Sequence, residues 1–531
     1  MTGDKAYRVL LADPIEESGR RMFEQAGAEV HVLADDERER LPEILADFDA
    51  LVVRSRTKVT AELLAAGSRL KVVGRAGIGV DNVDIPAATA RGILVVNAPT
   101  ANMISATEHT FALMLTMARN IAAASASVKN EEWDRKRFLG AELQGKTLGV
   151  VGFGRIGQAV AERARAFDME ILAYDPFLDP AMAKRLGVEL LALEDLLPRA
   201  DFVTLHTPLT EQTRNLIDAG RIAQMKPGAR LINCGRGGVI DEEALLVALE
   251  EGHLAGAALD VFAQEPPTDW QLVKHPRVVV TPHIGAQTQE AQERVATDTV
   301  RMVLGALDGS LAVTAVNLPF GAPGQQGAPY LGLAQQLGRL ASSLLPGGLG
   351  VLHVDSWGID EPLHTPITVA AVKGALTPAL GDAVNYVNAA RLAESRGIQV
   401  VHSAHQGPTA YSHLIGVTVR GGDREVRLEG TLFNDDDPRV VGFGNYRLEF
   451  SPGGTLLVMQ NRDVPGVVGR LGTTLGEGGV NIAEIHLARE AGGQAAMAVV
   501  RLDSEPADEI LVAIRAFDEV EDVQVVVLGE T

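Results

Sequence analysis

Three side chains suited to oxidising an alcohol follow three apolar runs in the middle of the chain. Arg236 lies in INCGRGG, Glu265 in LDVFAQEPP and His283 in VVVTPHIGA. A histidine that is neutral near pH 7 can accept a hydroxyl proton, and a neighbouring carboxylate would fix its tautomer and raise its pKa. The arginine would bind a carboxylate or a carbonyl oxygen. The sequence therefore predicts an acid–base site, with His206, which also follows an apolar run, as the competing base.

Two further arginines stand at the ends of apolar runs nearer the N-terminus. Arg54 closes ALVVR, and Arg75 follows LKVVG. Ligands of open α/β sheets bind at the carboxyl ends of strands, where arginine can hold a carboxylate or phosphate with two hydrogen bonds. Ordinary surface arginines would fit the same pattern. Arg135, in the basic stretch WDRKR, lies in a solvated turn or reaches a neighbouring active site.

Residues 146–175 carry the pattern of a dinucleotide-binding turn. An apolar run leads directly into Gly152, Gly154 and Gly157, a helical pattern follows, and a second apolar run ends at Asp175. The glycines allow a tight turn, close approach of the backbone to a pyrophosphate, and close packing of helix on strand. Free N–H groups at the helix N-terminus attract the phosphates. Because Asp175 would accept from ribose hydroxyls and repel a 2′-phosphate, NAD is favoured over NADP.

The elements that must position these residues alternate between short strands and amphipathic helices. Residues 1–98 predict a parallel sheet with helices on both faces. A long helix over 101–128 leads into a second such domain, residues 99–287, which contains the dinucleotide turn. A helix near 288–307 would carry the chain back, so residues 288–316 belong to the first domain, which is discontinuous.

The C-terminal part of the chain shows no catalytic set. GAPGQQG, residues 321–327, is a linker, and residues 317–453 mix helices and strands as a third, α+β domain. Residues 454–531 follow the order βαββαβ, which predicts a ferredoxin-like domain. Regulation or assembly is the function expected of this last domain.

Length, net charge and cysteine content limit the classes of protein to which the chain can belong. With 531 residues it should form three to four domains. A net charge of −21 argues against generic binding of nucleic acid. The single cysteine, Cys234, excludes an internal disulfide and a cysteine-built metal cluster. We expect no metal, no signal peptide and no membrane span, and therefore a cytoplasmic protein.

Several stretches resemble known sequence motifs. GRAGIGVDNVD, GKTLGVVGFGRIG, NCGRGGVIDE, LDVFAQEPP and TPHIGA resemble those of the D-isomer-specific 2-hydroxyacid dehydrogenases, and within them the long-type D-3-phosphoglycerate dehydrogenases. VNYVNAARLAESRGI resembles the intervening domain of that group, and DVPGVVGRLGTTLGEGGVNIAEIHLAR resembles its ACT regulatory domain. The resemblance implies a Rossmann-type NAD domain inserted in a flavodoxin-like substrate domain, followed by intervening and ACT domains.

The resemblance also implies a reaction and roles for residues. The reaction is oxidation of 3-phosphoglycerate to 3-phosphohydroxypyruvate with NAD, the entry to serine biosynthesis. His283 would be the acid/base, Glu265 its partner and Arg236 the substrate-orienting arginine. Arg54 and Arg75, with Arg135 of a neighbouring subunit, would hold the anionic groups of the substrate. The positions that match cofactor contacts, besides the three glycines, are Arg155, Ile156, Asp175, Thr207, Cys234 and Asp260.

The family's assembly and regulation give further expectations. A homotetramer is implied, and allosteric control by L-serine would act through Asp463 and Asn481. Asn461 stands where serine-sensitive members tend to carry histidine or tyrosine, a departure from the pattern of those members.

Two other functions remain open. Another D-2-hydroxyacid dehydrogenase, acting on hydroxypyruvate, glyoxylate or 2-oxoglutarate, would use the same chemistry. The uncharged side chains of hydroxypyruvate and glyoxylate, however, would need no arginines beyond those that bind the carboxylate. A non-catalytic NAD-sensing interaction protein would bind NAD without turnover, but it would not need His283, Glu265 and Arg236.

Overall fold

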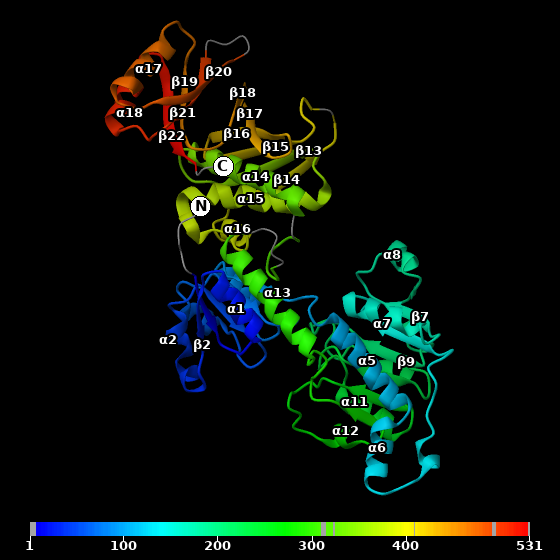
Figure 1. Ribbon diagram of the computed structural model, residues 1–531. Helices are drawn as coiled ribbons and strands as arrows, with labels where there is room; N and C mark the ends of the chain where they lie inside the picture. Colours follow the sequence, from blue (N-terminus) through cyan, green and yellow to red (C-terminus); the bar gives the residue numbers. More distant parts are fainter. Residues whose placement is uncertain (1–6, 310–314, 322–323, 408, 491–494, 529–531) are drawn as a thin grey trace.

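The computed structural model describes residues 7–309, 315–321, 324–407, 409–490 and 495–528, which form four sheets (Figure 1). Residues 322–323 of the expected linker, and 310–314 near the expected end of the first domain, lie outside the described residues. The predicted fold class is confirmed. The domain boundaries stay a prediction.

The first sheet is parallel and has the flavodoxin-like strand order β2-β1-β3-β4-β5. Its four-residue strands are largely apolar because helices cover both faces; all of ALVV in β3 is buried. The strands are β1 (Arg8–Leu11), β2 (Glu29–Val32), β3 (Ala50–Val53), β4 (Val72–Arg75) and β5 (Leu94–Asn97). The helices that precede residue 98 are α1 (Glu17–Gln25), η1 (Asp35–Arg40), α2 (Leu41–Leu45), α3 (Ala61–Ala66) and α4 (Ile85–Ala90).

A helix from much later in the chain completes the core of this first sheet. Helix α13 (Gln289–Leu307) places Val295, Val300 and Val303 in the same buried cluster as residues of β1, β3 and β4. In Figure 1 this helix runs from the first sheet toward the second. The first sheet is thus built from two separate parts of the chain.

The second sheet is also parallel, in the Rossmann order β8-β7-β6-β9-β10-β11-β12. Its strands are β6 (Thr147–Val151), β7 (Glu170–Tyr174), β8 (Glu189–Leu190), β9 (Phe202–Leu205), β10 (Arg230–Asn233), β11 (Gly256–Leu259) and β12 (Val278–Val280). The helices around it are α5 (Met103–Ala118), α6 (Ile121–Lys129), η2 (Arg135–Phe138), α7 (Arg155–Arg165), α8 (Pro180–Arg185), α9 (Leu193–Leu196), α10 (Ala219–Gln224), α11 (Glu242–Glu250) and α12 (Gln271–Lys274).

The third sheet has six strands in the order β14-β13-β15-β16-β17-β18. They are β13 (Val351–Trp357), β14 (Gln399–His405), β15 (Leu414–Gly421), β16 (Arg424–Phe433), β17 (Asp437–Phe443) and β18 (Tyr446–Phe450). The accompanying helices are α14 (Gly324–Ser343), α15 (Glu361–Leu380), η3 (Gly381–Ala383) and α16 (Ala389–Ser395).

The fourth sheet has the ferredoxin-like order β20-β21-β19-β22. Its elements are β19 (Thr455–Arg462), α17 (Val467–Glu477), β20 (Ile482–Arg489), β21 (Ala495–Leu502), α18 (Asp508–Arg515) and β22 (Val520–Val527). One face packs on the third domain, since Leu456, Val499 and Val526 share a buried cluster with Leu337 and Leu340 of α14. Two hydrogen bonds join the same surfaces: Arg339 donates to the carbonyl oxygen of Val527, and Gln524 to that of Leu344.

Some expected elements differ from the observed ones. The helix expected over 101–128 is two helices, α5 and α6, which are bent by 64° where Asn120 has a φ of 52°. The linker expected over 321–327 already belongs in part to α14, which begins at Gly324. Helix ends are difficult to locate from sequence at polar or small residues such as Asn120 and Gly324, because these residues occur both inside helices and at their ends.

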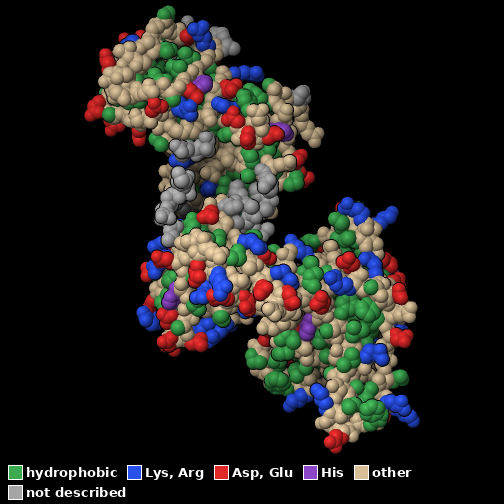
Figure 2. Space-filling view, viewed as in Figure 1, with side chains coloured by type: hydrophobic (Ala, Val, Ile, Leu, Met, Phe, Trp, Pro, Cys, Tyr) green, Lys and Arg blue, Asp and Glu red, His purple; other side chains and the backbone are tan. Residues whose placement is uncertain are grey.

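Among the described residues, no single helix is long and apolar enough to cross a membrane; the bent pair α5–α6 meets the length and composition of a span. Much of α5 is buried within the protein, including Phe111, Met114 and Met117. On the face shown in Figure 2, acidic and basic side chains are interspersed, and this face offers no continuous basic surface of the kind that follows a nucleic-acid backbone.

Candidate active site

His283 and Glu265 form a hydrogen-bonded pair beyond the carboxyl ends of β11 and β12. His283 Nδ1 lies 2.7 Å from Glu265 Oε2. This bond raises the pKa of His283 above its ordinary value, against the lowering effect of burial and of the Arg236 charge. Burial would raise the pKa of Glu265, but the bond to His283 and one from the backbone N–H of Phe262 outweigh it, so the pKa is lowered. With Nδ1 held by the carboxylate, Nε2 is left to exchange a proton with a substrate.

The competing histidine, His206, has a different environment. Its Nε2 lies 3.0 Å from the hydroxyl of Thr204 in β9. Burial lowers the pKa of His206 to about 4, which would keep the ring neutral at any working pH. A group that stays neutral can accept a proton only weakly, so the geometry favours His283 as the acid–base residue.

A buried carboxylate supports the loop that carries His283. Asp260, directly after β11, is 1% exposed and accepts from the backbone N–H groups of Ile284 (2.9 Å) and Gly285 (2.8 Å) and from the hydroxyl of Thr281 (2.6 Å). His109 of α5 lies 3.2 Å from the same carboxylate. Burial alone would raise the pKa of Asp260, but these hydrogen bonds lower it. Asp260 therefore holds the loop that carries His283 in place. The contact of Asp260 with the cofactor stays a prediction.

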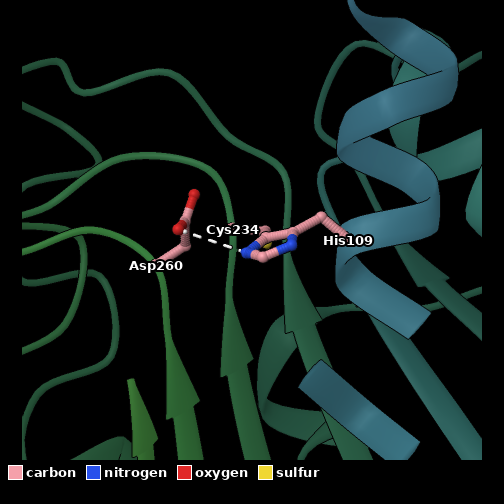
Figure 3. A group of neighbouring side chains, drawn as sticks. All are labelled: His109, Cys234 and Asp260. Atoms are coloured by element: carbon pink, nitrogen blue, oxygen red, sulfur yellow. Dashed lines mark hydrogen bonds and ion pairs between the residues drawn. The ribbon is translucent and has the colours of Figure 1, made fainter. Parts of the chain in front are cut away.

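Figure 3 shows His109 and Asp260 beside Cys234, which lies after β10. Their side-chain donor atoms lie within 4.8 Å of one another, as the ligands of a metal ion would. Burial and the charge of Asp260 raise the pKa of the Cys234 thiol to about 12. The oxygens of Asp260 are already engaged, and we interpret the group as support for the loop.

Three arginines gather near this pair and are called here the arginine cluster: Arg54, Arg75 and Arg236. Burial, followed by repulsion from Arg236 and from Arg54, lowers the pKa of Arg75 to about 10, although Asp81 and Asp13 oppose it. The Arg75 guanidinium lies directly over Gly77, whose φ is 152°, and a Cβ there would meet Nη1 at 1.4 Å. The Nε of Arg75 is buried without a partner among the described residues. Such an excess of positive charge suits an anionic ligand.

The loop that carries Arg54 is held from two sides. Asp13, 2% exposed at the end of β1, accepts from the backbone N–H groups of Arg54 (2.7 Å) and Thr57 (3.0 Å). Asn82 donates to the carbonyl oxygens of the same two residues, at 2.6 and 2.7 Å. The backbone at Arg54 is thereby fixed, and its side chain extends to Gln292, to which Nη2 donates at 2.5 Å.

The dinucleotide turn has the geometry that its glycines predict. Gly152 has a φ of 89°, and a Cβ on Gly157 would meet the Gly152 oxygen at 2.2 Å, so helix α7 packs closely on β6. A Cβ on Gly154 would meet nothing within 4 Å, and α7 begins there without a side-chain cap. The open space and the free N–H groups of Arg155, Ile156 and Gly157 fit a pyrophosphate.

Two further side chains lie beside this turn. Asp175 accepts from the backbone N–H groups of Phe153 (2.8 Å) and Phe177 (2.9 Å), which fixes its carboxylate at the end of β7. The hydroxyl of Thr207, next to Gly152, is buried without a partner among the described residues. Both positions fit the edges of a bound dinucleotide.

The remaining expected residues lie elsewhere. Arg135 is exposed in η2, after α6, which Figure 1 shows at the end of the second sheet away from the first; its role at a cleft would need a second chain. In the ACT-like part, Asp463 pairs with Arg489 at 2.8 Å and Asn481 donates to Asp503 at 2.6 Å. Asn461 is only 4% exposed, so its expected contact with an effector would need a different conformation.

Sequence reasoning missed the residues that position others: Asp13, Asp81, Asn82, His109 and Gln292. Asp81 and Asn82 stand within GRAGIGVDNVD, but their targets lie in distant segments. His109 is separated from Asp260 by 151 positions. No local pattern marks such partners.

Comparisons with known proteins identify the family. Residues 111–285 match the family model of the D-isomer specific 2-hydroxyacid dehydrogenase NAD binding domain, and residues 327–443 match that of the D-3-phosphoglycerate dehydrogenase intervening domain. A D-3-phosphoglycerate dehydrogenase of Methanocaldococcus jannaschii is 42% identical over 523 residues, 98% of this chain and 99% of the relative. One of Synechocystis is 43% identical over 509 residues, 95% of this chain and 92% of the relative.

The chain belongs to the D-3-phosphoglycerate dehydrogenase family of D-isomer-specific 2-hydroxyacid dehydrogenases. It is therefore an NAD-dependent oxidoreductase.

Solved structures of other dehydrogenases are similar to a little over half of this chain. A D-lactate dehydrogenase from Aquifex aeolicus, complexed with NAD and lactic acid, is 30% identical with a TM-score of 0.51 and covers 57% of this chain and 96% of its own. An NAD-dependent formate dehydrogenase from Staphylococcus aureus, in complex with NAD, is 31% identical with a TM-score of 0.51 and covers 57% and 96%.

Proposed function

We propose that the chain oxidises 3-phospho-D-glycerate to 3-phosphohydroxypyruvate with NAD, and catalyses the reverse reduction. One observation carries the choice of substrate: the arginine cluster beside the His283–Glu265 pair, where burial, together with repulsion from Arg236 and Arg54, lowers the pKa of Arg75 to about 10. The proposed substrate bears a carboxylate and a phosphate, and both need cationic partners. A substrate with a single carboxylate would leave part of this charge uncompensated.

The residues divide the work as follows. Arg236 orients the carboxylate and the developing carbonyl oxygen, while Arg54 and Arg75 hold the phosphate. In the oxidation, Nε2 of neutral His283 takes the proton of the C2 hydroxyl while the hydride leaves C2, and Glu265 stabilises the imidazolium that forms. NAD, when bound at the turn before α7, supplies the hydride acceptor. In the reduction, protonated His283 returns the proton to the carbonyl oxygen.

The decisive assay uses purified protein with 3-phosphoglycerate and NAD, and separately with 3-phosphohydroxypyruvate and NADH, because oxidation of this alcohol is the uphill direction. We expect turnover in both directions. The Arg54→Ala variant should raise KM for the phosphorylated acid far more than KM for hydroxypyruvate. Equal effects on the two substrates would contradict the phosphate assignment, and NAD binding without any turnover would favour the NAD-sensing alternative.

We also propose that L-serine is an effector of the ACT-like part. The proposal is supported by the likeness of residues 463–489 to ACT domains and by two polar side chains, Asp463 and Asn481, that are not buried. Their present partners, Arg489 and Asp503, would have to exchange for the ammonium and carboxylate groups of serine. Calorimetric titration of L-serine tests the proposal, with D-serine as the control; absence of heat with both would leave the domain as an assembly module or a receptor for another ligand.

The assembly that we propose is a homotetramer, and at least a dimer is needed for Arg135 to act on a neighbouring cleft. Apolar side chains along the α6–η2 segment support an interface there, since Trp133 is 79% exposed and Leu139 88% exposed. Light scattering coupled to size exclusion tests the proposal, and a monomer at micromolar concentration would contradict it.

A further inference from the structure

Gln292 lies on the first turns of α13, between the arginine cluster and the catalytic loop. Its side-chain amide makes two hydrogen bonds in opposite directions. Oε1 accepts from Nη2 of Arg54 at 2.5 Å, and Nε2 donates to the carbonyl oxygen of Ala286 at 2.8 Å. Ala286 is three residues beyond His283 in the same loop. One amide thus contacts both the proposed phosphate-binding arginine and the segment that carries the acid–base histidine.

The two bonds join parts of the protein that belong to different sheets. Helix α13 packs through Val295, Val300 and Val303 on the first sheet, so Gln292 is fixed to the same body as Arg54. The loop from His283 to Ala286 is fixed to the second sheet, because Ile284 and Gly285 donate to Asp260. Within the loop, the N–H of Gln287 donates to the oxygen of Ile284 at 2.8 Å. A shift of Ala286 is therefore transmitted to His283 over a short, hydrogen-bonded segment.

We propose that Gln292 is a positioning residue that couples the Arg54 anion site to the position of His283. The inference rests on the proposed function, because it gives the phosphate-binding arginine a second task. An anion that binds Arg54 competes with, or reorients, the bond to Gln292 Oε1, and the amide passes this change to Ala286 and its loop. The phosphate of the substrate, which takes no part in the chemistry, would in this way help to align the reacting histidine.

The chemistry of the side chain explains why an amide is suited to this position. A glutamate of the same length would pair with Arg54 and neutralise the charge that the phosphate needs. It would also place an acceptor against the carbonyl oxygen of Ala286, where a donor is required. A methionine would fill the space without either bond. The two substitutions therefore separate loss of coupling from loss of anion-binding charge.

The test compares Gln292→Glu and Gln292→Met with Gln289→Glu, an exposed amide one turn earlier on the same helix that serves as the matched control. Reduction of 3-phosphohydroxypyruvate and of hydroxypyruvate is measured for each. We expect Gln292→Glu to raise KM for the phosphorylated substrate about tenfold or more, with a much smaller effect on hydroxypyruvate, because Arg54 is then occupied. Gln292→Met should mainly lower kcat, and should reduce the kcat advantage of the phosphorylated substrate over hydroxypyruvate.

A binding measurement keeps the inference testable independently of turnover. Calorimetric titration with inorganic phosphate should give about tenfold weaker binding for Gln292→Glu than for Gln289→Glu, with thermal unfolding confirming that both variants fold. Equal phosphate affinity in these two variants, or equal kinetic constants for all three, would overturn the coupling role. A wild-type protein that binds phosphate but does not turn over the phosphorylated substrate would instead contradict the proposed function.

Discussion

Arg236 and Asp81 form an ion pair that joins the loops after β10 and β4, with 3.1 Å between Nε and Oδ2. The two strands belong to different sheets, so the pair bridges the two halves of the proposed active site. Arg236 also donates from Nη1 to the oxygen of Gly235 at 2.8 Å. The arginine that is expected to orient the substrate is therefore already oriented by a carboxylate of the other sheet.

This geometry predicts that substituting Asp81 lowers kcat/KM less than substituting Arg236. The side chains of Arg236 and Asp81 are 29% and 59% exposed, and pairs so exposed contribute about 0.2–1 kcal/mol. Asp81→Asn should therefore lower kcat/KM no more than about fivefold. Arg236→Ala should lower it by roughly 10- to 150-fold, because charged hydrogen bonds to a substrate are worth about 1.5–3 kcal/mol. Steady-state kinetics at two salt concentrations measure both, and equal losses would make Asp81 as important as the arginine.

The bond between His283 and Glu265 predicts the pH dependence. The pKa of His283 is raised by this bond, so oxidation, which needs the neutral ring, is lost as pH falls through the raised pKa. Reduction needs the protonated ring and is lost as pH rises through the same pKa. Glu265→Gln removes the negative charge, and both limbs should move to lower pH.

Profiles of kcat/KM in the two directions measure this shift. For the Glu265→Gln variant, kcat/KM for reduction should be lower near neutral pH than at acidic pH. Glu242→Gln is a suitable control, since that carboxylate is near Glu265 but accepts from the backbone N–H of Ala263 rather than from His283. Limbs that stay in place would show that another group sets the pH dependence.

The two histidines at strand ends predict opposite outcomes for the same substitution. His283→Ala should lower kcat by about 10² or more, the usual range for loss of a general acid–base group. His206→Ala should leave kcat within a few-fold of wild type, since among the described residues the ring bonds only to the Thr204 hydroxyl, and burial lowers its pKa to about 4. Near-normal kcat in His283→Ala, with a large loss in His206→Ala, would reverse the assignment.

The parts of the site that could be predicted from sequence are those whose residues follow a recognisable pattern within a short stretch of the chain. The glycines of the dinucleotide turn are recognised by their spacing. The polar residues at strand ends are recognised because parallel strands bring their carboxyl ends to one edge of the sheet. The apolar runs likewise predicted most strands of the first two sheets, because buried parallel strands are almost wholly apolar. Strands β17 and β18 were not predicted, since β18 alternates buried and exposed residues over only five positions.

What could not be predicted is how the side chains satisfy one another across the chain. Asp260 was expected at the cofactor, but whether a carboxylate faces a ligand or supports a loop depends on neighbours such as His109, far away in sequence. Gln292 looked like one more polar residue on a helix. Only the packing of α13 on the first sheet places it between Arg54 and Ala286.

Asp175 predicts the choice of cofactor. Its carboxylate is fixed at the end of β7 by the backbone N–H groups of Phe153 and Phe177, and it would repel the additional phosphate of NADP. Asp175→Asn keeps the shape and removes the charge. We expect KM for NAD to rise about tenfold, in line with loss of a charged hydrogen bond, and the preference for NAD over NADP to shrink by a similar factor. Comparison of kcat/KM for the two cofactors measures it, with Asp179→Asn, which removes the carboxylate that caps α8, as control. An unchanged ratio in Asp175→Asn would mean that the backbone around the turn, rather than this carboxylate, excludes the 2′-phosphate.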